Sequence, residues 1–197
     1  MTPGMSTENR HEAARDVMRQ LGIGEDWLAV ADPDIPPDLL EILTDSLRAW
    51  GRTDLDWLID WCDPEIVIRQ VPEIPDSSTY TGPEAFVDAL LDWPRQWEDF
   101  QIDPRRIFAA DDDHLVIVAL HRGRPASMDI HVEQEIAFLT RYRGPRLLAW
   151  DMFLTPEEAL GRAAERRGHA DDDRPAEGDG RERAQEAGPE EARADHR

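Results

Sequence analysis

The sequence contains no lysine and only one cysteine, and each shortage restricts what the protein can do. All 22 basic residues are arginines, and they stand against 43 acidic residues, which gives a formal net charge of −21. A protein with this charge repels phosphate backbones and anionic lipid headgroups, so we expect no nucleic-acid partner and no membrane partner. Cys62 has no second cysteine with which to form an intrachain disulfide or a cysteine-based zinc site.

Long apolar runs are also missing. No stretch reaches the ~20 apolar residues that a membrane-spanning helix needs, and residues 1–18 lack the basic and apolar segments of a signal peptide. We therefore expect a soluble cytoplasmic protein. The sequence does have the material for a core, because 40% of its residues are hydrophobic and seven are tryptophan. This is sufficient for one well-buried domain.

Changes in composition divide the chain into three parts. Residues 1–36 combine a short amphipathic helix, predicted over 7–21, with a proline-containing linker. Residues 37–167 carry the periodic apolar patterns of a folded domain. Residues 168–197 contain no Val, Leu, Ile, Met, Phe, Tyr or Trp. Such a segment cannot bury enough surface to offset chain entropy, so we predict a disordered acidic tail.

Within residues 37–167, predicted helices precede most of the predicted strands. Pro37, a residue favoured at the first helical position, begins a helix that ends at Gly51. Thr53 and Asp56 have the spacing of a capping box for a second helix. A third helix follows Gly82, and a second capping box at Thr155 begins a last helix to about residue 167. Strands are predicted over 65–71, 100–102, 105–109, 115–122, 130–142 and 147–153, and a loop over 72–81.

Short motifs accompany these elements in a consistent order: Asp54-Leu55, Asp63-Pro64-Glu65, Tyr80-Thr81-Gly82, Thr140–Gly144 and Thr155–Leu160. With them, residues 37–167 resemble the SnoaL-like polyketide cyclase group of the nuclear transport factor 2-like superfamily, which also contains ketosteroid isomerase. The resemblance implies an α+β fold in which a cone-shaped, curved, mostly antiparallel sheet wraps around the N-terminal helices. It also implies a cavity between sheet and helices, and commonly a homodimer. The superfamily includes enzymes, binding proteins and assembly modules, so the fold alone does not select a function.

The catalytic residues of ketosteroid isomerase are not matched. That enzyme uses an aspartate base, with a tyrosine and a protonated aspartate that stabilise the enolate. The aligned positions here hold Arg69, Asp45 and Ile136. Arginine cannot act as a base near neutral pH, and isoleucine donates no hydrogen bond. Steroid-isomerase chemistry is therefore disfavoured.

Strand side chains alternate between two faces, which suggests the polar groups that enter the cavity. Over 130–138 the even-numbered residues are apolar except Gln134, so we expect Gln134 to face the cavity. In the last strand, Asp151 shares one alternating set with Leu147 and Phe153. If that set points inward, Asp151 is a lone carboxylate among apolar groups and a candidate general acid or base. The alternative is that Asp151 forms a structural ion pair with an arginine, for which Arg69 is the leading candidate.

The remaining candidates each have a functional and a structural interpretation. His121 ends the predicted strand over 115–122 and is either a proton shuttle at the cavity mouth or a surface residue. Asp45 either points into the pocket or faces solvent. Tyr80 precedes Gly82, where its ring is placed to cover the cavity entrance. Trp61 and Trp97 either line a pocket for a flat ligand or pack in the core and at a dimer contact.

Two functions remain open. The first is a binding module or structural dimer module whose cavity takes an apolar small molecule. The second is a small acid–base enzyme, of isomerase, cyclase or hydrolase type, that acts on an apolar or polyketide-like compound. In that enzyme Asp151 is the base, and Arg69, Gln134 or His121 positions an oxygen atom or stabilises negative charge. The sequence carries no complete catalytic set, so the first function is favoured, and we expect no cofactor and no metal.

Overall fold

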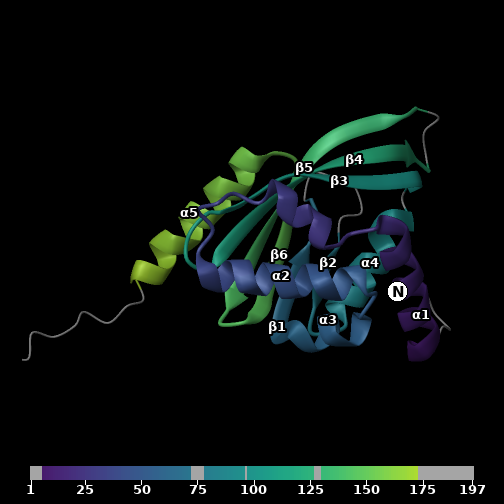
Figure 1. The fold of residues 1–197 in the computed structure, drawn as a ribbon, viewed down its shortest axis with the longest axis horizontal. Helices are drawn as coiled ribbons and strands as arrows, with labels where there is room; N and C mark the ends of the chain where they lie inside the picture. Colours follow the sequence, from purple (N-terminus) through teal and green to yellow (C-terminus); the bar gives the residue numbers. More distant parts are fainter. Residues whose placement is uncertain (1–5, 72–77, 96, 127–129, 173–197) are drawn as a thin grey trace, which may run out of the picture.

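The computed structural model describes residues 6–71, 78–95, 97–126 and 130–172. The chain forms an α+β fold in which helices near the N-terminus pack on a six-stranded, curved, mixed sheet (Figure 1). This confirms the fold class expected from the sequence. Across the described residues, every helix is too short or too polar to cross a lipid bilayer.

The first helices have the ends that the sequence indicates. Helix α1 (Thr7–Leu21) begins at Ser6, whose side chain accepts a hydrogen bond from the Asn9 amide, and ends at Gly22, which has a left-handed φ of 62°. A 3-10 helix, η1 (Glu25–Val30), follows. Helix α2 (Pro37–Gly51) then buries one apolar face, of which Leu39, Leu43, Leu47 and Trp50 are members.

Helix α3 (Leu55–Trp61) is capped by a different residue from the one predicted. The carboxylate of Asp54 accepts a hydrogen bond from the Trp57 amide at 3.2 Å, whereas Thr53 has a left-handed φ of 57° and lies outside the helix. The capping box at the last helix is confirmed. In α5 (Pro156–Asp172) the Thr155 amide donates to Glu158 at 3.2 Å, and the Glu158 amide donates to the Thr155 hydroxyl at 3.3 Å.

The sheet has the strand order β2-β1-β6-β5-β4-β3. Only β1 and β6 are parallel neighbours among the described strands, so the sheet is mostly antiparallel. Strand β2 lies where the sequence suggested a loop. The strands are β1 (Cys62–Arg69), β2 (Thr79–Thr81), β3 (Trp97–Ala109), β4 (His114–Pro125), β5 (Val132–Arg143) and β6 (Arg146–Phe153), and α4 (Ala85–Arg95) connects β2 to β3.

Strand β3 is one long strand rather than the two predicted short ones. Its register shifts between Pro104 and Arg106, and again between Glu98 and Gln101. Proline cannot donate to a ladder, so it is tolerated at an irregular position of an edge strand. β3 is an edge strand, which explains why the strand continues past Pro104 with a shift of register.

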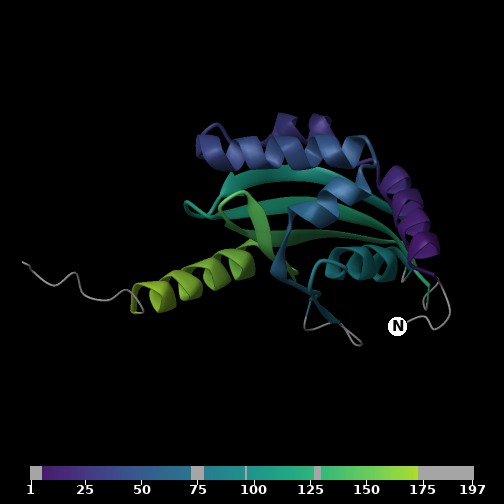
Figure 2. The same cartoon turned by 90° about the horizontal axis from the view of Figure 1, so that it is seen from below.

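The two faces of the sheet are covered by different helices. The larger core lies between one face and the segments before β1, together with α4. Helix α5 packs on the opposite face of β4, β5 and β6 and projects away from α1, at the other end of the molecule (Figures 1 and 2). This second, smaller core is made of Val116, Val118, Ala137, Leu139, Ala159 and Ala163.

A β-bulge in β6 reverses the expected direction of its side chains. Arg141 lies opposite Ala149, whereas the next residue of β5, Tyr142, lies opposite Leu147, so Leu148 is an extra residue in β6. Leu147 therefore joins the larger core, while Asp151 lies opposite Leu139 on the α5 face. The expectation that Asp151 points inward with Leu147 is wrong, because the bulge breaks the alternation between them.

The N-terminal residues pack into the same core as the sheet. Ala14 and Met18 of α1, Trp27 of η1 and Ile35 are all buried there. At the other end of the chain, α5 continues to Asp172, so the first residues of the predicted disordered tail are helical. The rest of that predicted tail lies outside the described residues.

Candidate functional site

A cavity of about 130 Å³ lies between the inner face of the sheet and the covering helices. Most of the side chains that line it are apolar, and no aspartate or glutamate is among the described residues in its wall. Aromatic rings come from η1, α2, α3, α4 and three strands: Trp27, Trp50, Trp61, Phe86, Phe100, Phe138, Tyr142 and Trp150.

The rings contact one another in a continuous series across the cavity wall. Trp150 lies 5.5 Å from Phe138 with the two rings nearly perpendicular, and 6.0 Å from Phe86, measured between ring centroids. Phe86 in turn meets Trp50 at 5.6 Å, edge to face. Edge-to-face pairs of this kind are favourable and hold each ring in one orientation. The wall is therefore built from rings that support one another.

The hydroxyl groups in the wall are bonded to the protein itself. Ser46 donates to the carbonyl of Leu43 at 2.8 Å, and Thr140 donates to the carbonyl of Leu115 at 3.3 Å. Burial raises the pKa of Tyr142 to about 12, although a hydrogen bond with Thr140 acts in the opposite direction. These groups are neutral at physiological pH and have partners, so they add little polarity to the cavity.

His121 lies in the cavity wall rather than at a strand end. It is 2% exposed, and its ring packs at 5.0 Å edge to face against Phe100 and at 5.8 Å from Phe138. Burial lowers the pKa of His121 to about 3. A buried imidazolium is disfavoured because the charge loses its hydration. His121 is therefore a neutral member of the wall at neutral pH.

Asp151 and Arg69 are brought together, but on the α5 side of the sheet. Arg69 donates to one carboxylate oxygen of Asp151 at 2.7 Å, and Arg166 of α5 donates to the other at 2.5 Å. Asp151 is 3% exposed and does not line the cavity, whereas Arg69 reaches both the ion pair and the edge of the cavity wall. This geometry is the structural ion pair that the sequence offered as the alternative for Asp151. It places the Asp151 carboxylate outside the cavity.

Two other candidates lie outside the cavity. Gln134 lies opposite His121 and so on the inner face as expected, but it is exposed and does not contribute to the wall. Asp45 is exposed on α2, 3.4 Å from Arg48, and borders a separate surface groove. A residue on the inner side of a strand or helix lines the cavity only if it also lies under the covering helices.

Of the three aromatic candidates, Trp61 lies in the cavity wall, whereas Trp97 and Tyr80 do not. Trp61 lines the cavity and stacks on Trp57 at 5.8 Å. Trp97 packs beside Phe100 at the start of β3 but is absent from the wall. Tyr80 donates to Asp92 at 2.8 Å instead of covering an entrance, and burial, ahead of its contact with Asp92, raises its pKa to about 12.

Several wall residues were missed in the sequence analysis. Leu21, Ile23 and Trp27 come from the N-terminal part, which the sequence suggested was an extension and linker. A signal was present, because large apolar side chains such as Leu21, Ile23 and Trp27 are usually buried, and a linker exposed to solvent would leave them uncovered. Thr140 and Tyr142, which belong to the Thr140–Gly144 motif, also line the cavity.

One cluster has the composition of a metal site. Asp111, Asp113 and His114 offer ligand atoms that lie within 4.8 Å of one another at the β3–β4 turn. The Nδ1 atom of His114 is 2.7 Å from Asp111 and 2.6 Å from Asp113, so hydrogen bonding accounts for the arrangement. None of the three lines the cavity.

Several solved structures have similar folds, and each matches this chain over most of its own length. A Catenulispora acidiphila protein with a ketosteroid isomerase-like fold, in complex with trimethylamine, is 18% identical; the match covers 63% of this chain and 92% of that chain, with a TM-score of 0.46. An NTF2-like protein from Burkholderia xenovorans is 23% identical, with 64% and 95% covered and a TM-score of 0.48. A steroid delta-isomerase from Pseudomonas aeruginosa is 19% identical, with 71% and 97% covered and a TM-score of 0.46.

No curated protein matches the chain. Residues 43–148, more than half of the sequence, match the SnoaL-like domain. This match spans α3, α4, strands β1 to β5, the first three residues of β6, and the part of α2 that faces the cavity. The chain therefore belongs to the SnoaL-like domain family.

Proposed function

We propose that the protein binds a small apolar molecule, about the size of one aromatic ring, in the cavity between the sheet and the helices. The observation that carries the proposal is a wall of eight aromatic side chains that contains no carboxylate among the described residues. Its volume of about 130 Å³ is close to that of an engineered protein cavity of about 150 Å³ that binds benzene. Pockets for drug-sized ligands are about 300–1,000 Å³, so a multi-ring polyketide is too large for this conformation.

The free-energy cost of an empty cavity supports a ligand over a purely structural role. Protein cores are close-packed, and each Å³ of cavity costs about 24 cal/mol. For a cavity of about 130 Å³ the cost is about 3 kcal/mol. That is a large fraction of the roughly 5–15 kcal/mol by which domains are stable. A bound apolar molecule would offset it by restoring the missing contacts.

The alternative, a small acid–base enzyme, has one observation in its favour. His121 places an imidazole in the cavity wall. With a pKa of about 3 it is a weak base near neutral pH, and Asp151 is bonded to two arginines on the other face of the sheet. Consumption of a bound compound by the wild type, but not by His121→Phe, would favour the enzyme.

A homodimer is retained as part of the proposal. Helix α5 covers the outer face of β4, β5 and β6, so a partner chain has to contact another surface. Sedimentation velocity of the purified protein tests this. A single species at the monomer mass across micromolar concentrations would remove the dimer.

The test of ligand binding uses nitrobenzene, a single-ring compound that quenches tryptophan fluorescence. Four of the tryptophans line the cavity: Trp27, Trp50, Trp61 and Trp150. We expect saturable quenching by the wild type. Ala89 also lines the cavity, so Ala89→Leu should fill part of it and weaken binding about 10-fold or more, a difference of about 1.4 kcal/mol.

The matched control is Ala164→Leu, the same change at an exposed position of α5. It should bind nitrobenzene as the wild type does. Linear, non-saturating quenching in all three proteins would contradict the proposal, because it would show collisions with exposed rings instead of occupation of a site.

A further inference from the structure

The segment that closes one side of the cavity lies before the SnoaL-like match. Residues 7–30, which form α1 and η1 and are called the cover below, precede the matched residues 43–148. Three side chains of the cover, Leu21, Ile23 and Trp27, form part of the cavity wall. The cavity is therefore completed by a segment that the family domain does not include.

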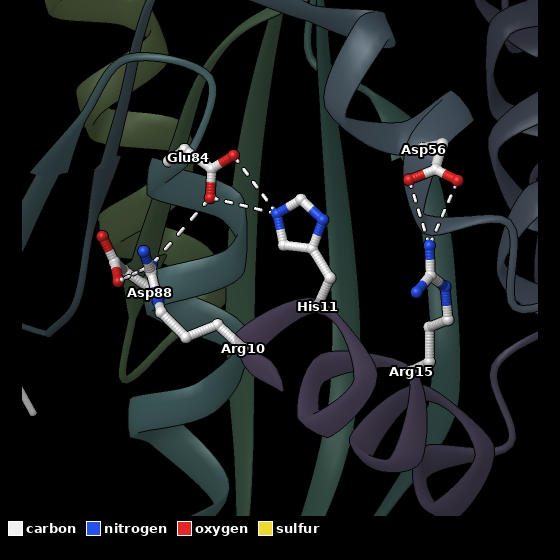
Figure 3. A network of polar contacts seen from close by, with 6 residues as sticks. All are labelled: Arg10, His11, Arg15, Asp56, Glu84 and Asp88. Atoms are coloured by element: carbon white, nitrogen blue, oxygen red, sulfur yellow. Dashed lines mark hydrogen bonds and ion pairs between the residues drawn. The ribbon is translucent and has the colours of Figure 1, made fainter. Parts of the chain in front are cut away.

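On its outer side, helix α1 of the cover makes charged contacts with α4 (Figure 3). Arg10 forms an ion pair with Asp88 and lies 4.0 Å from Glu84. The Nε2 atom of His11 is 3.3 Å from Glu84. Glu84 and Asp88 are 46% and 44% exposed. Exposed ion pairs of this kind each stabilise a structure only slightly.

A second charged contact holds α1 to α3. Arg15 donates to both carboxylate oxygens of Asp56, at 3.0 and 3.1 Å (Figure 3). Asp56 is 76% exposed, so this pair is also weak. Two side chains of α1, Ala14 and Met18, are buried, and Ala13, Val17 and Leu21 pack against the same core while partly exposed. Helix α1 is thus attached by one apolar face, and the charged contacts around that face are weak.

The chain directly after the cover is fixed more firmly. The Asp32 amide donates to the carbonyl of Ile107 at 2.8 Å, and Ala31 bridges the same residue at the edge strand β3. Arg106 also donates to Asp32 through two nitrogens, at 3.1 and 2.6 Å, but Arg106 is 59% exposed, so the backbone contacts are the firm ones. Between the two ends lie Gly22, whose left-handed φ of 62° favours glycine, and Gly24.

From this contrast we infer that α1 is the hinged part of the cover, that it opens about residues 22–24 to exchange the ligand, and that Leu21 limits the size of the ligand. The inference rests on the proposed function, because it names the route into the same cavity. Elements that must move to admit a ligand belong to the weakly held parts of a fold. In this chain α1 meets that description, whereas the sheet and α2 do not.

The test removes the contacts made by the two arginines, Arg10 and Arg15, and measures opening without any ligand. In the double variant Arg10→Gln and Arg15→Gln, amide hydrogen exchange in α1 should become about 5-fold faster than in the wild type, since each exposed pair contributes little. Exchange in β4 and β5 should not change. The control is Arg162→Gln, which removes an exposed pair with Glu165 within α5 and should leave exchange in α1 unchanged.

The same variants are then mixed with nitrobenzene in a stopped-flow fluorimeter. The double variant should bind and release the probe about 5-fold faster, with little change in Kd. Unchanged exchange in α1, or equal rates in the double variant and the control, would overturn the inference. If α1 opens faster but nitrobenzene never gives saturable quenching, the hinged cover stands and the proposed function fails.

A separate experiment tests whether Leu21 limits the size of the ligand. Leu21→Ala should bind 1-nitronaphthalene about 10-fold more tightly than the wild type does, because it enlarges the cavity at the end of the cover. Leu160→Ala is the matched control, since Leu160 is 40% exposed on α5. An equal affinity of the two variants for the two-ring probe would remove Leu21 from this role.

Discussion

The two faces of the sheet show how the same strands can build two different interiors. On the inner face, Phe138, Trp150 and Met152 line an apolar cavity. On the outer face of the same strands, Leu139 packs beneath α5, and Asp151 is bonded to Arg69 and Arg166. The comparison indicates that buried charge in this protein holds an α-helix to the sheet, while the cavity excludes carboxylates among its described residues.

The division between the faces depends on one inserted residue. Without Leu148 as a bulge, strict alternation would put Asp151 on the same side as Leu147, which belongs to the larger core. The cavity would then contain the Asp151 carboxylate, and Trp150 would face the opposite side of the sheet. The bulge therefore separates a binding surface from a structural ion pair.

The largest effect is expected from Asp151→Ala, which removes the buried charge from the outer face. Arg69 and Arg166 would lose their common partner in a site where Asp151 is 3% exposed. Breaking a buried pair costs 3–5 kcal/mol, and the partial exposure of both arginines places the expected loss of unfolding free energy at about 3 kcal/mol. Urea denaturation measures it.

Binding of nitrobenzene should persist in Asp151→Ala at temperatures where the variant is folded, because the cavity lies on the other face. Glu157→Ala, at an exposed position of α5, is the control and should change stability little. Abolished binding with unchanged stability would reverse the roles assigned to the two faces.

An intermediate effect on the unfolding free energy is expected from a change of pH, through His121 on the inner face. The pKa of His121 falls from an ordinary value of about 6.5 to about 3 in the folded protein because the ring is buried. Below about pH 6.5 the unfolded chain binds a proton that the folded protein does not. Stability should therefore fall as pH decreases from about 6.5 to 3, by about 1.4 kcal/mol per pH unit.

In His121→Phe this contribution is absent. Between pH 7 and pH 5 the variant should lose about 2 kcal/mol less unfolding free energy than the wild type. Urea titrations of both proteins at pH 7, 6 and 5 give the difference. Parallel losses in the two proteins would mean that the ring is protonated in the folded state and is not buried as described.

The smallest effect is expected at the start of α5. Thr155→Ala removes the hydroxyl that accepts from the Glu158 amide, and such a change costs about 1 kcal/mol. Hydrogen exchange should speed up in α5 and not in the helices of the inner face. Faster exchange in α2 as well would show that the two cores unfold together.

Much of the fold could be predicted from sequence because local signals specify it. Pro37 and Gly51 bound α2, and Thr155 with Glu158 begins α5. The errors arise where the signal is not local. Pro104 does not end a strand, because β3 is at the edge of the sheet, and no residue near it in sequence reports that position.

The candidate site was predicted less completely for the same reason. Whether Gln134 or His121 enters the cavity depends on how far the helices extend over a sheet, and the alternation of strand residues does not contain that information. The bulge at Leu148 lacks a glycine or proline that would reveal it. The ion pair of Arg69 with Asp151 was considered because opposite charges in an apolar sheet need partners.

The most direct test of the account is a crystal structure of the protein soaked with bromobenzene, located by the anomalous scattering of bromine. We expect one strong anomalous peak inside the cavity, among Phe86, Phe138 and Trp150, and no peak beneath α5. A cavity without a peak in crystals that bind bromobenzene elsewhere would contradict the claim that this wall of aromatic rings is a ligand site.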